Sequence, residues 1–149
     1  ESGCMKFIPG SHKGQIVPHF DTFDDNNLLS RGQEISVKVN EKEAKHIELK
    51  PGQASMHHGH LFHASGPNKT ADRRIGCAIR YIKPSMKQLS GDLSLVTLVS
   101  GVDDYGHFTK FEKPNGRLNE ENFERCYLDC KIKRRVLYEG VDASRGKRY

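Results

Sequence analysis

Apolar and polar residues alternate in several short runs along the first sixty residues of the chain. Residues 5–8 form one such run before a Pro-Gly turn, residues 35–39 and 45–49 alternate again, and residues 54–58 follow the turn KPGQ. A period of two is typical of strands with one buried face. The pattern therefore predicts four short, half-buried strands, with residues 14–32 as a long polar loop of the kind that often covers a site.

Two further apolar segments and one helical pattern follow. Residues 75–82 and 93–99 are apolar and strand-like, and both are predicted to be central strands. Residues 119–138 have Asn119 as an N-cap, two acidic residues directly after it and apolar positions at helical spacing, which predicts one C-terminal helix. Short strands with polar turns and no alternating helices favour a mainly β fold of the antiparallel jelly-roll type.

The composition fits one domain, or most of one. The chain has 149 residues, of which 29% are charged, and this length is enough to bury a real core. No apolar run approaches the roughly 20 residues that span a bilayer, and the first residues lack the basic and apolar pattern of a signal peptide. The sequence therefore predicts a cytoplasmic protein without a membrane partner.

The net charge of +5 does not by itself indicate a nucleic-acid partner. Basic residues cluster only in KIKRR, at 131–135, and in the closing RGKRY, and neither run is interleaved with aromatic residues. We expect a solvated helix end and a disordered tail, and no nucleic-acid partner.

The four cysteines, Cys4, Cys77, Cys126 and Cys130, show neither zinc-ribbon spacing nor a CxxC pair. We expect free, buried thiols that serve as small core residues. The last two lie four residues apart, so they share one face of the predicted helix, where packing is their expected role.

The most informative chemistry lies in the stretch HHGHLFHASGPNKTADRR, residues 57–74. Its candidate metal ligand is His63, because a neutral imidazole is the commonest protein ligand for a divalent transition metal. Its candidate acid-binding residue is Arg74, whose planar charged fork suits a carboxylate. Ser65 lies two residues after the histidine and is expected to help bind the same acid. A surface arginine beside a patch of surface histidines is the alternative interpretation.

The residues between these candidates favour a strand, a loop and a second strand. SGPNKTAD is rich in turn-forming residues, and the sequence becomes strand-like on both sides. Antiparallel neighbours would bring His63 and Arg74 toward each other. Alternation would also place His57 on the same face as His63, with His58 and His60 on the other face, so that all four rings cannot meet one ion.

This stretch resembles the phytanoyl-CoA dioxygenase family of iron(II)- and 2-oxoglutarate-dependent oxygenases. Family members carry a similar HxxLxHxSGxN block, with an arginine eleven residues after the second histidine. Here the block covers residues 58–68 and Arg74 follows at that distance. ESGCMKFIPGSHKG at the start and SGVDDYGHF near residue 105 also resemble family segments, and the likeness is weakest after about residue 119.

The resemblance implies a role for each candidate residue. His63 would be the distal iron ligand, and Arg74 with Ser65 would hold the far carboxylate of 2-oxoglutarate. Residues 1–118 would be the C-terminal part of a double-stranded β-helix, a cupin-like jelly roll that is incomplete here, and residues 119–149 would be a C-terminal helix and basic tail. The implied activity is a dioxygenase that uses dioxygen to hydroxylate a small organic substrate, with release of succinate and carbon dioxide.

The resemblance also places the first two iron ligands in an HxD motif upstream of ESGCMKFIPGSH, so this chain is expected to lack them. His19 and Asp21 spell HxD literally, but family order places them after the GSHK turn, where we expect loop residues, with a ligand role as the lesser alternative. Two other functions stay open. One is a halogenase of the same superfamily, in which chloride replaces the carboxylate ligand, and the other is a noncatalytic jelly-roll binding module without metal.

Overall fold

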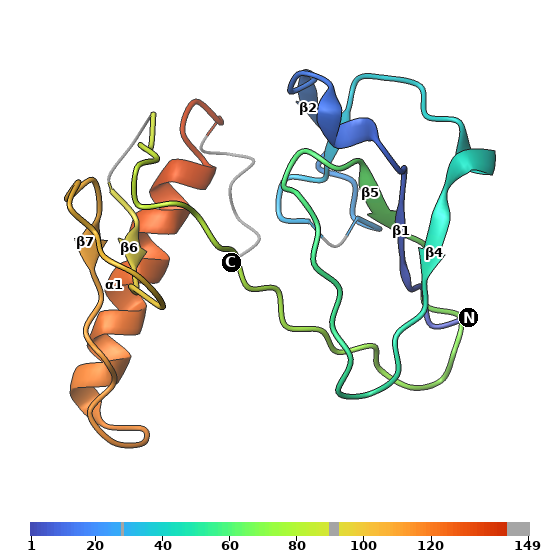
Figure 1. Ribbon diagram of the computed structural model, residues 1–149. Helices are drawn as coiled ribbons and strands as arrows, with labels where there is room; N and C mark the ends of the chain where they lie inside the picture. The colour runs from blue at the N-terminus through green and yellow to red at the C-terminus, as the bar shows by residue number, and fades with distance from the viewer. Residues whose placement is uncertain (28, 90–92, 143–149) are drawn as a thin grey trace. The chain divides into compact units, whose positions relative to one another are not determined.

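Short strands in small sheets and one long helix make up the regular structure of residues 1–27, 29–89 and 93–142, which are the residues that this computed structural model describes (Figure 1). The chain divides into two units, Glu1–Ala78 and Ile79–Tyr149, and each is described by itself. The boundary predicted after residue 118 remains a prediction, and the predicted tail at 145–149 lies outside the described residues.

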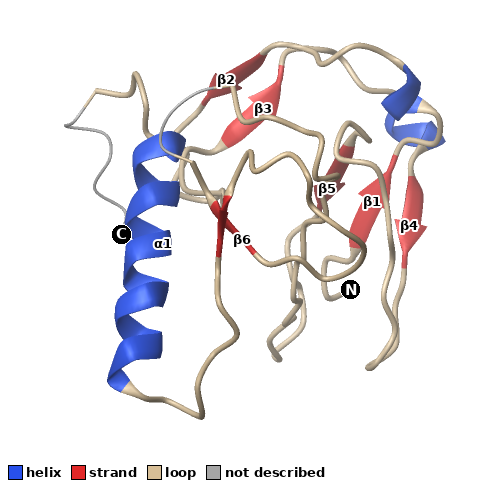
Figure 2. Cartoon of the chain, turned by 60° about the vertical axis from the view of Figure 1, so that its left-hand side comes forward, coloured by secondary structure: helices blue, strands red, loops and turns tan. Residues whose placement is uncertain are grey.

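The main sheet of the first unit has three antiparallel strands in the order β4-β1-β5 (Figure 2). Strand β1 is Met5–Phe7, β4 is Lys45–Ile47 and β5 is His63–Ser65. The central strand β1 is bonded on both sides, and its Phe7 lies opposite Lys45 on one side and His63 on the other. Phe7 is the buried hydrophobic residue of this unit, with 8% of its surface exposed. The strands predicted at 5–8 and 45–49 are confirmed, one and two residues shorter.

A serine hydroxyl joins the end of β1 to the residue before β5. Ser11, at the start of the 3-10 helix η1 (Ser11–Lys13), donates to the carbonyl of Ile8 and accepts from the backbone amide of Phe62, both at 2.8 Å. The Ile8 amide also donates to the Phe62 carbonyl at 3.0 Å. These bonds continue the pairing of β1 and β5 by one residue, so the chain enters β5 in a fixed register.

The second sheet pairs β2, His19–Asp21, with β3, Gln33–Ile35. It corrects the prediction of a loop over 14–32, because His19 and Asp21 lie in a strand. The Asp21 carboxylate accepts two hydrogen bonds from Arg31, from Nε at 3.0 Å and from Nη2 at 2.6 Å. Asp21 ends β2 and Arg31 lies in the turn before β3, so this ion pair ties the turn to the end of the first strand.

The connection from β3 to β4 contains the short 3-10 helix η2, Glu41–Glu43. Asn40 caps it, since its side-chain oxygen accepts from the Lys42 amide at 3.2 Å. The strand predicted at 35–39 is only partly confirmed. Strand β3 ends at Ile35, and it pairs with β2, which precedes it in the chain.

The second unit contains the helix α1, Glu120–Leu137, and a parallel pair of two-residue strands, β6 (Leu95–Val96) and β7 (Thr109–Lys110). In both views β6 lies alongside α1 (Figures 1 and 2). Ile132 on the helix is buried, with 8% of its surface exposed. The predicted helix is confirmed, with Asn119 as its N-cap and Tyr138 as its C-cap.

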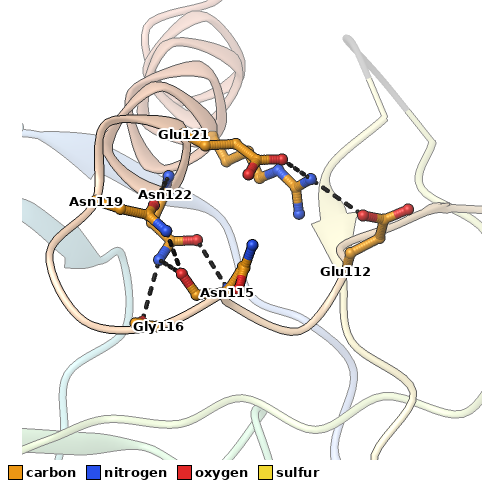
Figure 3. Close-up of polar contacts among 7 residues, drawn as sticks. Glu112, Asn115, Gly116, Asn119, Glu121 and Asn122 are labelled. Atoms are coloured by element: carbon orange, nitrogen blue, oxygen red, sulfur yellow. Dashed lines mark hydrogen bonds and ion pairs between the residues drawn. The ribbon is translucent and has the colours of Figure 1, made fainter.

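Polar side chains fix the start of α1 (Figure 3). The Asn119 side-chain oxygen accepts from the Asn122 amide at 2.9 Å, which satisfies one of the free donors of the first turn. The side-chain amides of Asn119 and Asn122 both donate to the carbonyl of Asn115 in the preceding turn. Arg125 then bridges two carboxylates, those of Glu112 and Glu121.

Three segments that were predicted to be strands differ from their predicted structure. Residues 75–82 form no strand, and their side chains are exposed, with Ile75 at 79% and Ile79 at 68%. Residues 54–58 also form no strand, and only Leu95–Val96 of the segment 93–99 does. Strand preference depends on packing against neighbours, and among the described residues none pairs with 75–82.

Burial is correspondingly small. Phe7 and Ile132 are the buried hydrophobic residues of the described part of the chain, so the expectation of a real core is wrong for this structure. All four cysteines are free thiols, but Cys77, Cys126 and Cys130 are exposed and Cys4 is partly exposed, so the prediction of buried thiols is also wrong. The sheets form no closed barrel within the described residues. Nor is any helix there both long enough and apolar enough to cross a bilayer.

The turn before β7 is held by one carboxylate. Asp103 accepts from the backbone amides of Gly106 at 3.2 Å and Tyr105 at 3.1 Å, and it pairs with Lys110 at 3.2 Å. These backbone hydrogen bonds, that of Gly106 first, lower the pKa of the Asp103 carboxyl, with a smaller contribution from Lys110. The ionised side chain therefore stabilises the turn.

We expect Ser11→Ala to destabilise the first unit by about 1–2 kcal/mol, because it removes two hydrogen bonds and leaves the Phe62 amide without its partner. Chemical denaturation, followed by backbone amide signals of β1 and β5, measures the effect. Ser55→Ala, at an exposed serine outside the sheets, is the matched control. Equal stability of the two variants would contradict the bridging role of Ser11.

Asp103→Asn should reduce the acid sensitivity of the second unit. A carboxyl whose pKa is lowered on folding contributes stability above its unfolded pKa, and this contribution is lost as the pH falls through the folded pKa. Thermal unfolding between about pH 6 and pH 2 should therefore show a smaller fall in midpoint for Asp103→Asn than for the unchanged protein. The neighbouring Asp104→Asn is the control, and identical pH profiles for all three proteins would refute the role of Asp103.

Candidate functional site

His63 begins strand β5, and its side chain is exposed. Its Nδ1 lies 2.7 Å from the carbonyl oxygen of Leu61. A carbonyl can only accept, so Nδ1 carries the hydrogen, and in the neutral ring Nε2 keeps a free lone pair. Metal-binding histidines commonly donate their second ring nitrogen to a carbonyl or carboxylate in this way, which fixes the tautomer and the ring orientation.

Two aromatic rings lie against this imidazole. The centroid of His57 is 5.3 Å from that of His63, and Phe7 lies 6.4 Å from His63 in an edge-on orientation. Phe7 and His57 are themselves 4.6 Å apart. Burial lowers the pKa of His57, and the nearby His63 lowers it further, so the neutral form of His57 is favoured.

The other histidines of the stretch form a separate group. His58 lies 4.8 Å from His60 and 5.8 Å from His12, measured between ring centroids. The predicted division into two pairs is therefore confirmed. Its expected cause is wrong, however, because residues 58–61 form a turn in which the Leu61 amide donates to the His58 carbonyl at 3.0 Å.

Arg74 and Ser65 are in contact. The Nη2 atom of Arg74 donates to Oγ of Ser65 at 3.4 Å. Ser65 is two residues after His63 in β5, and side chains two apart lie on the same face of a strand. The arginine is thus brought to the face that carries the candidate ligand. The expected second strand is not the cause, since β5 pairs with β1 and not with residues after Arg74.

The loop between β5 and Arg74 is closed by its own side chains. The Asn68 side-chain oxygen accepts from the amide of Thr70 at 2.9 Å and from its hydroxyl at 2.7 Å. The Asn68 side-chain amide donates to the Asp72 carbonyl at 2.7 Å, and the Thr70 hydroxyl reaches the same carbonyl at 3.1 Å. The prediction of turn chemistry in SGPNKTAD is confirmed. These bonds turn the chain back so that Arg74 can reach Ser65.

The first residues of the chain brace this loop. The carbonyl of Glu1 accepts from the Lys69 amide at 2.9 Å. Gly3 has a positive φ of 73°, and a Cβ atom there would lie 2.3 Å from the carbonyl oxygen of Gly66. Only glycine fits so close an approach. Sequence reasoning missed Gly3 as a supporting residue, because a single glycine before a strand carries no signal of which loop it will meet.

An iron site fits these residues in part. His63 presents an imidazole nitrogen of the required tautomer. Within residues 1–27, 29–89 and 93–142, no group of three His, Cys, Asp or Glu side chains is placed to hold a metal ion. The literal HxD of β2 offers no free carboxylate, because Asp21 is paired with Arg31. Among these residues, His63 can therefore supply one donor atom to a metal. Arg74 supplies a positive charge nearby, through its contact with Ser65 of the same strand.

The family model described as phytanoyl-CoA dioxygenase (PhyH) matches residues 1–76, which include His63, Ser65 and Arg74. The chain belongs to the phytanoyl-CoA dioxygenase family. The PhyH match covers the first unit almost to its end, so it includes the sheet β4-β1-β5 and the loop after it.

Individual relatives agree with this assignment. The chain is 29% identical over 80 residues to a probable phytanoyl-CoA dioxygenase of Caenorhabditis elegans, covering 54% of this chain and 26% of that protein. It is 31% identical over 78 residues to the peroxisomal phytanoyl-CoA dioxygenase of Homo sapiens, covering 51% and 23%. It is also 30% identical over 83 residues to a probable alpha-ketoglutarate-dependent hypophosphite dioxygenase of Stutzerimonas stutzeri, covering 54% and 29%.

The chain spans about a quarter of the length of these curated relatives. No solved structure matches it significantly.

Proposed function

We propose that this protein is an iron(II)- and 2-oxoglutarate-dependent dioxygenase that hydroxylates a small organic substrate and releases succinate and carbon dioxide. The observation that carries the proposal is the hydrogen bond between Arg74 and Ser65 on the strand that begins with His63. Membership of the PhyH family and the alpha-ketoglutarate-dependent relative support the same chemistry.

His63 is proposed as a ligand of the iron. The bond from its Nδ1 to the Leu61 carbonyl leaves Nε2 as the free donor atom, and Phe7 and His57 lie against its ring. Iron(II), when bound, supplies the redox chemistry that couples decarboxylation of 2-oxoglutarate to activation of dioxygen. The protein's part is to present the donor nitrogen in one tautomer and one orientation.

Arg74 and Ser65 are proposed to bind the far carboxylate of 2-oxoglutarate. The Ser65 oxygen already accepts from Arg74, so its own O–H hydrogen remains available for an acid oxygen. The guanidinium has further N–H groups that can make charge-assisted bonds to the same carboxylate. The Ser65 hydroxyl and the Arg74 guanidinium would together hold one carboxylate of 2-oxoglutarate. The 2-oxo acid end would then be free to bind the metal.

The fold and domain expectations become part of the same proposal. The sheet β4-β1-β5 would be one portion of a double-stranded β-helix to which residues 1–118 contribute, and residues 119–149 would be an added helix and basic tail. The predicted cytoplasmic location also stays a proposal, since the human and rat relatives are named as peroxisomal.

Binding of iron(II) and 2-oxoglutarate distinguishes a dioxygenase from a noncatalytic binding module. A dioxygenase should be stabilised against thermal unfolding by iron(II) and 2-oxoglutarate together, measured without oxygen, because both bind only the folded protein. No shift of the midpoint with both present would favour the binding module. Chlorinated product formed from substrate in the presence of chloride would favour the halogenase.

His63→Ala should abolish succinate formation from 2-oxoglutarate, because it removes a proposed donor to the iron. The measurement is succinate release by the intact protein with iron(II), 2-oxoglutarate and oxygen. His60→Ala is the matched control, since His60 lies in the separate ring group with His58. Full turnover in His63→Ala would remove this residue from the metal site.

Arg74→Ala should raise the 2-oxoglutarate concentration needed for half-maximal succinate formation by roughly 10- to 100-fold, because a charge-assisted hydrogen bond is worth about 1.5–3 kcal/mol. Arg73→Ala provides the control, since Arg73 is an exposed arginine of the same loop and its backbone amide bonds to Asp72. Equal effects of the two substitutions would show that only general positive charge matters.

A further inference from the structure

We propose that His57 is a positioning residue for His63, acting through the packing of its ring and not as a ligand. This inference rests on the proposed function, because it assigns a support to the proposed iron ligand. His57 lies outside the block of residues that carries the family resemblance, one position before it.

The imidazole of His63 has few other restraints. The residue is exposed and begins a strand of three residues. Its side chain makes one hydrogen bond, to Leu61 two residues before it, within a segment that turns at residues 58–61. This single hydrogen bond restrains the His63 ring only weakly, because Leu61 is close in sequence and can move together with the ring.

Phe7 and His57 supply the missing restraint together. Phe7 is buried and lies directly opposite His63 in the β1–β5 pairing, with its ring edge-on to the imidazole at 88°. His57 packs on Phe7 with ring centroids 4.6 Å apart, and on His63 with centroids 5.3 Å apart. The three rings therefore form a closed triangle in which two of the three positions are set by the sheet. The third, His57, lies outside the strands and contacts both of the other rings.

The contact is made by the ring and not by its nitrogens. Within the described part of the chain, neither nitrogen of His57 makes a hydrogen bond. Its neighbours in space are two aromatic rings at distances and angles typical of packed aromatic pairs. A phenylalanine at position 57 preserves these contacts, whereas an alanine opens the triangle and lets the imidazole of His63 leave the Leu61 carbonyl.

The test is a long-range proton–nitrogen correlation spectrum of the His63 imidazole in the metal-free protein, at one pH above the range in which histidines titrate. The intact protein should show the Nδ1–H tautomer for His63. His57→Ala should give a mixture of tautomers, and His57→Phe should restore the single form. His60→Ala, in the other ring group, should leave the spectrum unchanged. Backbone amide signals of β1 and β5 verify that the sheet is intact in each variant.

Cobalt(II) titration in the presence of 2-oxoglutarate gives the second measurement. His57→Ala should weaken cobalt(II) binding roughly 10-fold or more, as loss of a group that orients a metal ligand commonly does, while His57→Phe should bind as the unchanged protein does. An unchanged His63 spectrum in His57→Ala overturns the inference. So does equal weakening in both variants, which would make His57 itself a ligand. If the tautomer results hold but the unchanged protein binds neither cobalt(II) nor 2-oxoglutarate, the proposed function fails and the positioning of His63 stands.

Discussion

The pairing of β1 with β5 is the constraint on which the candidate site depends. It places Phe7 opposite His63, and the bonds at Ile8 and Ser11 extend it to the residue before β5. Because β1 is also bonded to β4, the strand that carries the buried phenylalanine cannot shift without breaking two ladders. The orientation of the imidazole and the position of the following serine both follow from this one register, since a slip of one residue would turn each side chain to the opposite face.

The two ends of strand β5 have different electrostatic surroundings. Near His63, burial and then the imidazole of His63 lower the pKa of His57, which favours the neutral form of this ring. Two residues along β5, Ser65 carries the cationic guanidinium of Arg74. Under the proposed function, a co-substrate with two acid groups would suit this arrangement, because the permanent positive charge of Arg74 could hold one of its ends.

The loop after β5 shows how local bonds and distant contacts combine. Asn68 and Thr70 close the turn through their own side chains, and this part could be predicted from residue types that favour turns. The bracing of the loop by Gly3 and by the Glu1 carbonyl could not, because the contact joins residues more than sixty positions apart. Arg74 thus reaches Ser65 by a route different from the predicted antiparallel strand.

The sequence by itself determined the helix Glu120–Leu137, the turn chemistry of residues 65–72 and membership of the PhyH family, since caps, turn residues and motif spacing act between near neighbours. Only the tertiary structure decided which apolar segments became strands. Residues 45–47 and 63–65 did so because β1 lies between them, whereas residues 75–82, with a stronger strand preference, stay unpaired. It also decided that Phe7 would lie opposite His63. A strand is stabilised by backbone hydrogen bonds to a partner strand, and that partner lies elsewhere in the chain. Alternation of apolar and polar residues can therefore indicate a strand, but it cannot show whether those hydrogen bonds form.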